Sequence, residues 1–191
     1  MRRLLSLLFL TTIAFESFAQ SATVPKQNIP EEYGYIVKQG QEMPEVEFKL
    51  TDGTIIKTSD LKGKVVMLQF TASWCSVCRK EMPHIENEIW QKHKNNKDFA
   101  LFGIDMNEPV EKVIQFQKDI KVTYPLALDP GAKIFYTIAA ENAGVTRNII
   151  IGKDGKIAYL TRLYKEEEFN EMKEVIELLL KVPPNLPKGE K

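Results

Sequence analysis

The sequence has few of the residue types from which metal centres are usually built. Its 191 residues include two cysteines and two histidines, Cys75, Cys78, His84 and His93. A structural zinc site generally takes four ligands, and His84 lies six residues past Cys78, off the helical face that Cys78 would occupy. We therefore predict no metal site and no bound cofactor, and we keep a zinc- or copper-binding module as an alternative.

An excess of charge of one sign is also missing. The 26 lysines and arginines are balanced by 26 aspartates and glutamates, so the formal net charge is zero. A protein that binds nucleic acid or an acidic membrane surface needs a concentrated basic surface. The composition therefore argues against a nucleic-acid partner.

The N-terminus lacks a hydrophobic run long enough to span a membrane. Two arginines precede an 11-residue apolar run, Leu4 to Ala14, which is too short for the ~30 Å of hydrocarbon in a bilayer. Together with the small residues Ser17 and Ala19, this pattern predicts a signal peptide over residues 1–19 that is cleaved after Ala19. No cysteine follows the cleavage site, so a lipid anchor finds no acceptor. We expect an exported, periplasmic protein.

Removal of the signal peptide leaves 172 residues with a net charge of −1, which fits one domain with a sizeable core. Residues 20–39 carry Pro25 and Pro30 among polar residues and are expected to form a linker or a loosely packed arm. The alternative, that Tyr33, Tyr35, Ile36 and Val37 pack on the domain, stays open. The domain is predicted over residues 40–182. A flexible tail is predicted over residues 183–191.

The chain is organised around the segment that contains both cysteines. The stretch from Val65 to Pro83 opens as an apolar, β-branched run that predicts a buried strand, crosses a short turn and continues with charged and apolar residues at helical spacing. Cys75 and Cys78 therefore fall at a strand-to-helix junction, where unpaired N–H groups and the helix dipole stabilise a thiolate. We predict that Cys75 is the nucleophile and that Cys78, one helical turn on, resolves a mixed disulfide. A purely structural bridge across two residues would add little stability.

The segment around the cysteines resembles the thioredoxin superfamily, and most closely its TlpA/ResA-like branch of exported thiol-disulfide oxidoreductases. The resemblance covers residues 40 to about 180 and is carried by these stretches: Phe70, Ala72–Pro83 with its Trp-Cys-x-x-Cys, Gly40–Pro44, Thr51–Gly53, Leu61–Lys64, Tyr124–Leu126, Leu128–Asp129 and Gly152–Ile157.

This resemblance implies a thioredoxin-like α/β fold. The expected architecture is a central mixed sheet flanked by helices, with an N-terminal β-hairpin and an inserted β-α unit. The resemblance also implies a monomer that reduces disulfides of substrate proteins through the Cys75–Cys78 pair, with electrons from a membrane thiol donor.

The remaining periodicity predicts the elements around the central strand. Strands or hairpin arms are expected at Val46–Leu50, Thr54–Lys57, Phe99–Asp105, Leu126–Leu128, Asn148–Ile151 and Lys156–Leu160. Helices are expected from the cysteines to about His93 with a bend near Pro83, and over Pro109–Ile120, Ala132–Ala139 and Lys165–Lys181.

Glu81 is the predicted proton carrier of the site. It follows Cys78 by three residues, about one helical turn, so its carboxylate can lie near the dithiol. Thioredoxins carry a buried aspartate six residues before the first cysteine, where this chain has Gln69, which cannot accept a proton. The resemblance likewise assigns proton handling to a glutamate at this place. The alternative is an ordinary solvated glutamate.

Substrate contacts are expected from Trp74, Val145 and Thr146. Trp74 would shield the dithiol and offer an apolar surface to a partner, although packing in the core is an equal alternative. Thr146 stands where the family pattern has a cis-proline that faces the cysteines and seats substrate backbone. The sequence departs from the family here, and Val145 and Thr146 are expected to face the cysteines instead.

The departure at Thr146 opens a second enzymatic interpretation. Peroxiredoxins share this fold and bind peroxide with a threonine, a cysteine and an arginine, and Thr71 and Arg147 supply the right types. Thr71 is nevertheless four residues before Cys75 where that pattern has three, and Arg147 lies one place late on its strand. A slip of one residue turns a strand side chain to the opposite face, so a thiol peroxidase is kept as the alternative.

Overall fold

All seven residues of strand β3 (Val65–Thr71) are buried, and the rest of the sheet is built around them. A computed structural model describes residues 24–183 of the chain. The other strands in this range are β1 (Glu47–Leu50), β2 (Ile55–Lys57), β4 (Phe99–Met106), β5 (Leu126–Asp129), β6 (Arg147–Ile151) and β7 (Ile157–Arg162). The α-helices are α1 (Ser76–Ile85), α2 (Gln91–His93), α3 (Val110–Ile120) and α4 (Glu166–Lys181).

The strands form one mixed sheet in the order β2-β1-β5-β4-β3-β6-β7. Strands β3, β4 and β5 are parallel, whereas β1 is antiparallel to β5 and β6 is antiparallel to β3. Helix α1 connects β3 to β4, and α3 connects β4 to β5, as parallel neighbours require. The predicted α/β architecture, with hairpins β1-β2 and β6-β7 at its two edges, is confirmed.

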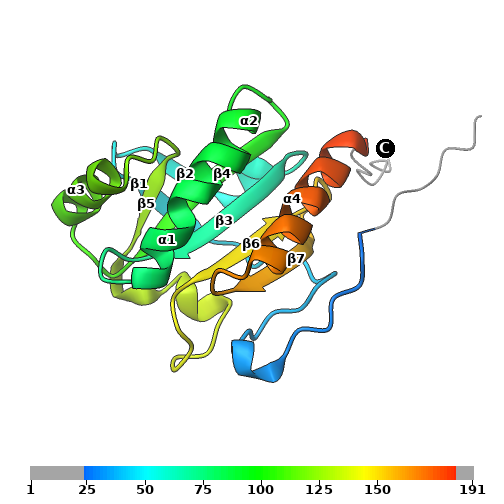
Figure 1. Cartoon of the computed structure of the whole chain (residues 1–191), viewed down its shortest axis with the longest axis horizontal. Coiled ribbons are helices and arrows are strands. Elements are labelled where there is room, and N and C mark those ends of the chain that lie inside the picture. Colours follow the sequence, from blue (N-terminus) through cyan, green and yellow to red (C-terminus); the bar gives the residue numbers. More distant parts are fainter. Residues whose placement is uncertain (1–23, 184–191) are drawn as a thin grey trace, which may run out of the picture.

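Side chains of β3 alternate between two covered faces. Thr71 points to the helices, where its hydroxyl lies 3.2 Å from Sδ of Met82 on α1. Phe70 points the other way and meets the ring of Phe135 edge-on, with 5.8 Å between the centroids. Figure 1 shows α1 and α4 lying across one face of the sheet. Because both faces are covered, β3 is mostly apolar and lacks the regular polar alternation of a strand with one exposed face; its polar residues Gln69 and Thr71 are buried as well.

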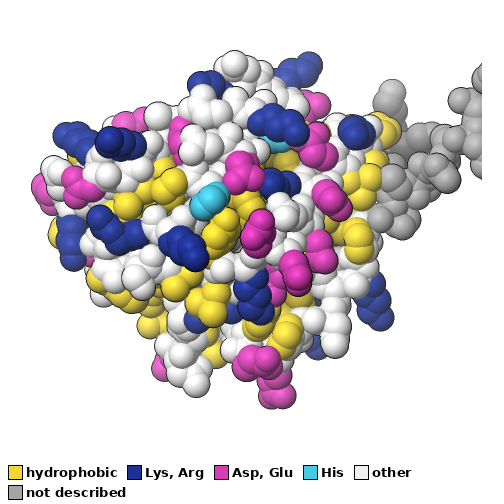
Figure 2. All heavy atoms as spheres, viewed as in Figure 1, with side chains coloured by type: hydrophobic (Ala, Val, Ile, Leu, Met, Phe, Trp, Pro, Cys, Tyr) yellow, Lys and Arg dark blue, Asp and Glu magenta, His cyan; other side chains and the backbone are white. Residues whose placement is uncertain are grey.

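The face that carries the helices exposes charges of both signs. Figure 2 shows lysines and arginines interspersed with aspartates and glutamates over this face. Two ion pairs connect helices across it, Lys173 with Glu88 and Lys92 with Glu177. Exposed pairs of this kind contribute about 0–1 kcal/mol each. Docking of the helices therefore depends on the buried apolar residues beneath them, which include Met82, Ile85, Ile89, Met172 and Ile176.

The helix that follows the cysteines extends to His93, as predicted, but it is not uniform. Between α1 and α2 the residues Glu86–Trp90 form a π-helical turn. Pro83 lies inside α1 and has no N–H, so one helical hydrogen bond is missing. The N–H of Glu86 is shared between the carbonyls of Met82 and Pro83. The irregular turn thus follows directly on the proline, a common cause of helix distortion.

The helix predicted over Ala132–Ala139 is wrong. This segment contains only short 3-10 turns, at Pro130–Ala132 and Phe135–Thr137. Ala132 has a left-handed φ of 55°, which interrupts a right-handed helix. The Asp129 carboxylate accepts hydrogen bonds from the backbone N–H groups of Ile134 and Phe135 at 2.8 and 2.9 Å. The buried aspartate therefore organises this loop in place of regular helical bonds.

We predict that Asp129→Ala lowers the free energy of unfolding by about 1–3 kcal/mol, because two buried N–H groups lose their acceptor. Urea unfolding followed by circular dichroism measures this change. Asp119→Ala, a matched change at a surface aspartate of α3, is the control and should leave the free energy of unfolding nearly unchanged. Equal stability of the Asp129 and Asp119 variants would contradict the assigned role.

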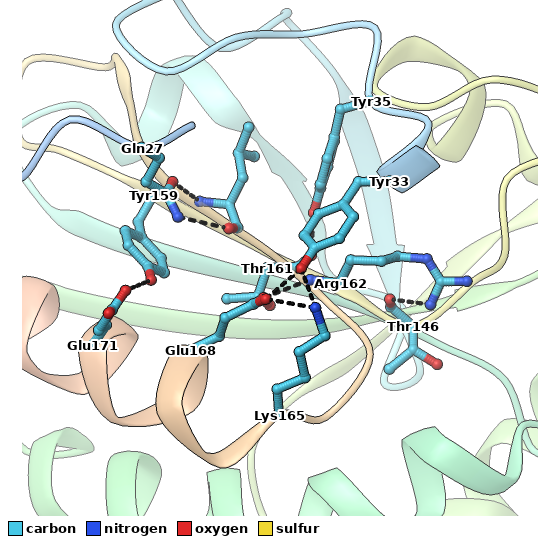
Figure 3. A network of polar contacts seen from close by, with 11 residues as sticks. Gln27, Tyr33, Tyr35, Thr146, Tyr159, Thr161, Arg162, Lys165, Glu168 and Glu171 are labelled. Atoms are coloured by element: carbon cyan, nitrogen blue, oxygen red, sulfur yellow. Dashed lines mark hydrogen bonds and ion pairs between the residues drawn. The ribbon is translucent and has the colours of Figure 1, made fainter. Parts of the chain in front are cut away.

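The segment expected to be a linker or loose arm instead packs on the sheet. Tyr33 and Val37 are buried, whereas Ile36 is 57% exposed. The side chain of Gln27 accepts a hydrogen bond from the N–H of Leu160 and donates one to its carbonyl, at 2.8 and 3.0 Å. Gln27 thus pairs with the free edge of β7, as Figure 3 shows. Covering an exposed strand edge is a common way to prevent sheet-to-sheet pairing.

Tyr35 connects this segment to the interior of the sheet. Its hydroxyl lies 2.6 Å from the carbonyl oxygen of Thr161 and 3.2 Å from that of Asn148. The guanidinium of Arg147 lies over the Tyr35 ring, 4.5 Å from its centroid. These contacts fix residues 33–37 against β6 and β7. The structural domain therefore begins earlier than residue 40.

The signal peptide predicted over residues 1–19, and the tail predicted over residues 183–191 apart from Pro183, lie outside the described residues. Among the helices of residues 24–183, none is both long enough and apolar enough to cross a bilayer.

Candidate active site at the Cys75–Cys78 pair

The two cysteines lie where strand β3 passes into helix α1. Cys75 is the N-cap of α1, and its Sγ accepts the backbone N–H of Cys78 at 3.1 Å. The two residues form a disulfide, with 5.3 Å between their Cα atoms. Cys75 is 7% exposed and Cys78 is fully buried. The positive end of the helix and a direct N–H donor thus favour a thiolate at Cys75, which is also the sulfur that a partner can reach first.

Thr146 lies against both sulfur atoms. Its Oγ1 is 3.1 Å from Sγ of Cys75 and 3.3 Å from Sγ of Cys78. Thr146 is 2% exposed and Val145 is 5% exposed, and no peptide bond within residues 24–183 is cis. The structure thus brings Thr146 to the dithiol from a segment 71 residues further along the chain.

Trp74 is the exposed residue of the redox turn. Its side chain is 64% exposed, which excludes packing in the core, the alternative weighed from the sequence. An exposed indole next to a disulfide offers a flat apolar contact surface to a partner protein.

Glu81 is buried and is not a solvated helix residue. It is 1% exposed, and Oε1 accepts a hydrogen bond from Nδ2 of Asn148 at 2.7 Å. Burial raises the pKa of Glu81 to about 7, although the hydrogen bond from Asn148 opposes the rise. A carboxyl with a pKa near the working pH can both take up and release a proton. Glu81 follows Cys78 by about one turn of α1, the helix that carries the dithiol at its N-terminus.

Buried polar residues of the sheet surround Glu81. Asn148 also donates to the hydroxyl of Thr161 on β7, at 2.8 Å. Gln69, which pairs with Asn148 across β3 and β6, accepts a hydrogen bond from the Tyr124 hydroxyl at 2.7 Å. Sequence reasoning missed Asn148 and Thr161. The available signal was an asparagine at the start of the otherwise apolar strand Asn148–Ile151.

Two further carboxyl groups, Glu108 and Asp105, lie near the turn before Cys75, and sequence reasoning missed both. Glu108 accepts hydrogen bonds from the backbone N–H and the hydroxyl of Ser73, at 2.6 and 2.8 Å, and forms an ion pair with Lys112. Asp105 is fully buried at the end of β4. Burial, reinforced by the adjacent Glu108, raises the pKa of Asp105 to about 8. Glu108 therefore fixes the turn before Cys75, and the raised pKa of Asp105 favours its protonated form near neutral pH.

The peroxide-binding arrangement is not formed. The Thr71 hydroxyl is directed to Met82, away from the sulfurs. Arg147 is buried on the other face of the sheet, where it donates to the carbonyl of Gly144 and lies over the rings of Tyr35 and Phe135. Neither side chain reaches Cys75. Arg147 lies one place late on its strand compared with the peroxiredoxin arginine, and its side chain accordingly points to the opposite face of the sheet.

The histidines take part in helix contacts. His84 lies 3.0 Å from Glu88 and stacks on Tyr164, and His93 lies 3.0 Å from Glu177. In residues 24–183, histidine, cysteine, aspartate and glutamate side chains do not come together in a group of three that could hold a metal ion.

Fold and site together define a dithiol-disulfide protein of the thioredoxin-like class: a mixed sheet whose central strand delivers a Cys-x-x-Cys pair to a helix N-terminus. Comparison with known proteins agrees. The sequence model of the Redoxin family matches residues 38–176. A thiol-disulfide oxidoreductase ResA of Bacillus cereus is 36% identical over 118 residues, which is 62% of this chain and 66% of that protein.

Two further relatives extend the comparison. ResA of Bacillus thuringiensis subsp. konkukian is 33% identical over 129 residues, which covers 65% of this chain and 72% of that protein. A solution structure described as a candidate protein disulfide isomerase from Bacteroides thetaiotaomicron is 59% identical, with a TM-score of 0.76, and covers 78% of this chain and 94% of that one. The chain therefore belongs to the Redoxin family and, within it, to the thiol-disulfide oxidoreductases of the ResA type. The predicted family, fold class and enzyme class are confirmed.

Proposed function

We propose that the protein reduces disulfides in exported substrate proteins. The observation that carries the proposal is the placement of the pair: Cys75 is the N-cap of α1 and accepts the N–H of Cys78, which is fully buried behind it. A thiolate at Cys75 is therefore both stabilised and reachable, whereas Cys78 can attack only a sulfur already bound to Cys75.

The reaction balances in two steps. The Cys75 thiolate attacks one sulfur of the substrate disulfide; a Cys75-substrate disulfide forms, and the other substrate sulfur leaves as a thiolate and takes a proton. Cys78, as thiolate, then attacks Sγ of Cys75, which forms the Cys75–Cys78 disulfide and releases the second substrate thiol. Two electrons pass to the substrate, and a thiol donor must return two electrons to the protein.

Glu81 supports the reducing direction. A buried carboxylate near a dithiol raises the pKa of the thiols, because it disfavours a further negative charge. An oxidant of this class owes its oxidising power to a stabilised reduced form. Glu108, whose carboxylate accepts the N–H of Ser73, adds a second negative charge next to the turn before Cys75. The acidic groups around Cys75 and Cys78 therefore favour the disulfide state of this protein and hence electron transfer to the substrate.

The partners and the compartment follow from the same proposal. A protein that reduces disulfides outside a reducing cytosol needs continuous resupply of electrons, and we propose a membrane thiol donor for this step. Export rests on the N-terminal pattern, with cleavage after Ala19 and a periplasmic location. Mass spectrometry of the protein recovered from the periplasm of an expressing bacterium tests this; a mature mass that includes residues 1–19 would contradict export by cleavage.

The reduction potential of the pair decides the direction of electron flow. We expect a value near ~−270 mV, typical of reductants, whereas oxidants of this class lie near ~−120 mV. Equilibration with glutathione or dithiothreitol buffers, read out by alkylation of free thiols and mass spectrometry, gives the potential. A reduced protein that fails to cleave insulin disulfides, or a potential close to the oxidant value, would overturn the proposed direction.

A further inference from the structure

The Thr146 hydroxyl is placed to act on sulfur. Its Oγ1 lies within hydrogen-bond distance of Sγ of Cys75 at 3.1 Å and of Cys78 at 3.3 Å. Sulfur in a disulfide carries no proton, so the hydroxyl must be the donor in this state. The side chain is 2% exposed, and a buried hydroxyl without an acceptor would be costly. The sulfurs are the acceptors that the described structure offers to it.

The backbone of Thr146 is held from the opposite side. Its carbonyl oxygen accepts hydrogen bonds from the N–H of Leu163 at 3.1 Å and from Nη1 of Arg162 at 3.2 Å. Figure 3 shows the Arg162 side chain reaching this carbonyl, on the side of Thr146 away from its hydroxyl. A Cβ at Gly144 would come within 2.2 Å of Nη2 of Arg162, so the guanidinium is closely packed on the loop. These contacts hold the backbone from which the hydroxyl reaches the two sulfurs.

A backbone carbonyl that is already bonded twice is a poor partner for a substrate strand. The side chain of Thr146, in contrast, faces the reacting atoms. When the disulfide is reduced, a thiolate at Cys75 has one donor from its own helix, the N–H of Cys78 at 3.1 Å. Thr146 offers a second donor from the sheet. Two donors on one anion stabilise it more than one.

We propose that Thr146 is a catalytic residue whose hydroxyl donates a hydrogen bond to the Cys75 thiolate in the dithiol state. The proton lost by the Cys75 thiol goes to solvent, and the threonine keeps its own. This contribution acts with the α1 N-terminus and against the negative charges of Glu81 on α1 and of Glu108, which follows β4. Asp105 at the end of β4 adds little charge near neutral pH, because burial raises its pKa to about 8. The cations nearby are Arg79 on α1, which donates to the carbonyl of Ser73, Lys112, which pairs with Glu108, and Arg162, which donates to the carbonyl of Thr146.

Ionisation of Cys75 needs no substrate, so the role of Thr146 can be tested without one. The inference rests on the proposed function only in its effect on the rate of disulfide exchange with a substrate. The test is the pH dependence of Cys75 alkylation by iodoacetamide in the Cys78→Ala background, where one thiol remains. Thr146→Val keeps the shape of the side chain and removes the hydroxyl. We expect about a tenfold lower alkylation rate below pH 7, which corresponds to a pKa higher by about one unit. Thr146→Ser should restore the wild-type profile.

Thr146→Ala gives the same readout if the valine variant does not fold, because it adds no methyl group beside the sulfurs. A profile for the valine or alanine variant that coincides with that of Thr146 would overturn the proposal, and so would a serine variant that behaves like valine. If the wild-type protein does not reduce insulin but the alkylation profile shifts as expected, the proposed function fails and the role of Thr146 stands. If the wild-type protein reduces insulin but the alkylation profile does not shift, the role of Thr146 is rejected and the proposed function stands.

Discussion

Cys75→Ala is expected to reduce disulfide exchange to the uncatalysed rate, whereas Cys78→Ala is expected to turn the protein into a trap for its substrates. The Cys75 sulfur is the accessible one and caps α1, so without it no mixed disulfide forms. Without Cys78, the mixed disulfide on Cys75 has no internal thiol to resolve it. Non-reducing gels of periplasmic extracts, with and without dithiothreitol, reveal the trapped species as bands that a reductant removes.

The comparison of the two variants is itself the control. Both remove one sulfur from the same turn of α1, and both prevent the Cys75–Cys78 disulfide, so a general loss of stability would affect them alike. Their melting temperatures should therefore be similar while their trapping differs completely. Trapping of equal amounts by both variants, or trapping by Cys75→Ala alone, would remove the roles assigned to the two sulfurs.

The central part of the fold was predictable because its signals are local. The run Val65–Thr71 is mostly apolar, with Gln69 and Thr71 as its polar members, since both faces of β3 are covered. The helical spacing after Cys75 follows within a few residues. Asp52-Gly53 and Gly152 to Gly155 mark hairpin turns directly. Each of these elements is specified by residues next to one another in the sequence.

Long-range contacts explain what the sequence did not show. The apolar spacing in Ala132–Ala139 is typical of a helix, yet Phe135, Ile138 and Ala139 are buried from a loop organised by Asp129. Polar residues before residue 40 suggested a loose arm, but Gln27 finds its partner 133 residues away on β7. Propensity and periodicity carry no information about partners at such separations.

The candidate site divides in the same way. The spacing of Cys75, Cys78 and Glu81 indicated that they lie together on one helix end. The residues that set their chemistry come from elsewhere: Asn148 is 67 residues from Glu81, and Glu108 is 35 residues from Ser73. Only the alignment with a family pattern placed Thr146 at the cysteines in advance, and only the structure shows that its hydroxyl touches both sulfurs.

Glu81→Gln is expected to change the pH dependence of stability. The pKa of Glu81 is about 7 in the folded protein because of burial, against about 4.3 in an unfolded chain. Between these values the folded state keeps the proton and the unfolded state has lost it, so the wild-type protein loses stability as pH rises, by roughly 1.4 kcal/mol per pH unit. Asp105, whose pKa is raised to about 8, adds a loss of the same sign in both proteins.

The glutamine variant lacks the part of this loss that comes from residue 81. Urea unfolding at pH 5 and pH 8 should therefore show that the variant gains on the wild type by about 2–3 kcal/mol between the two pH values. Glu111→Gln, a change at an exposed glutamate in the first turn of α3, is the matched control and should give no such gain. Parallel stability curves for wild type and Glu81→Gln would show that Glu81 is ionised over this whole range in the folded protein.

The same substitution is expected to slow disulfide exchange by about 10²-fold, in the range of general acid-base catalysis. Glutamine matches glutamate in size, and its carbonyl oxygen can accept the hydrogen bond that Nδ2 of Asn148 now donates to Oε1 of Glu81 at 2.7 Å. Glutamine cannot carry a proton. Above pH 7 the loss of the carboxylate should also lower the pKa of Cys75, because a neighbouring negative charge disfavours a thiolate. Insulin reduction measured from pH 5 to 9, together with the rate of Cys75 alkylation, separates these two effects. Faster alkylation combined with slower disulfide exchange assigns proton transfer to Glu81. Unchanged rates of exchange and alkylation would show that Glu81 is a buried structural residue.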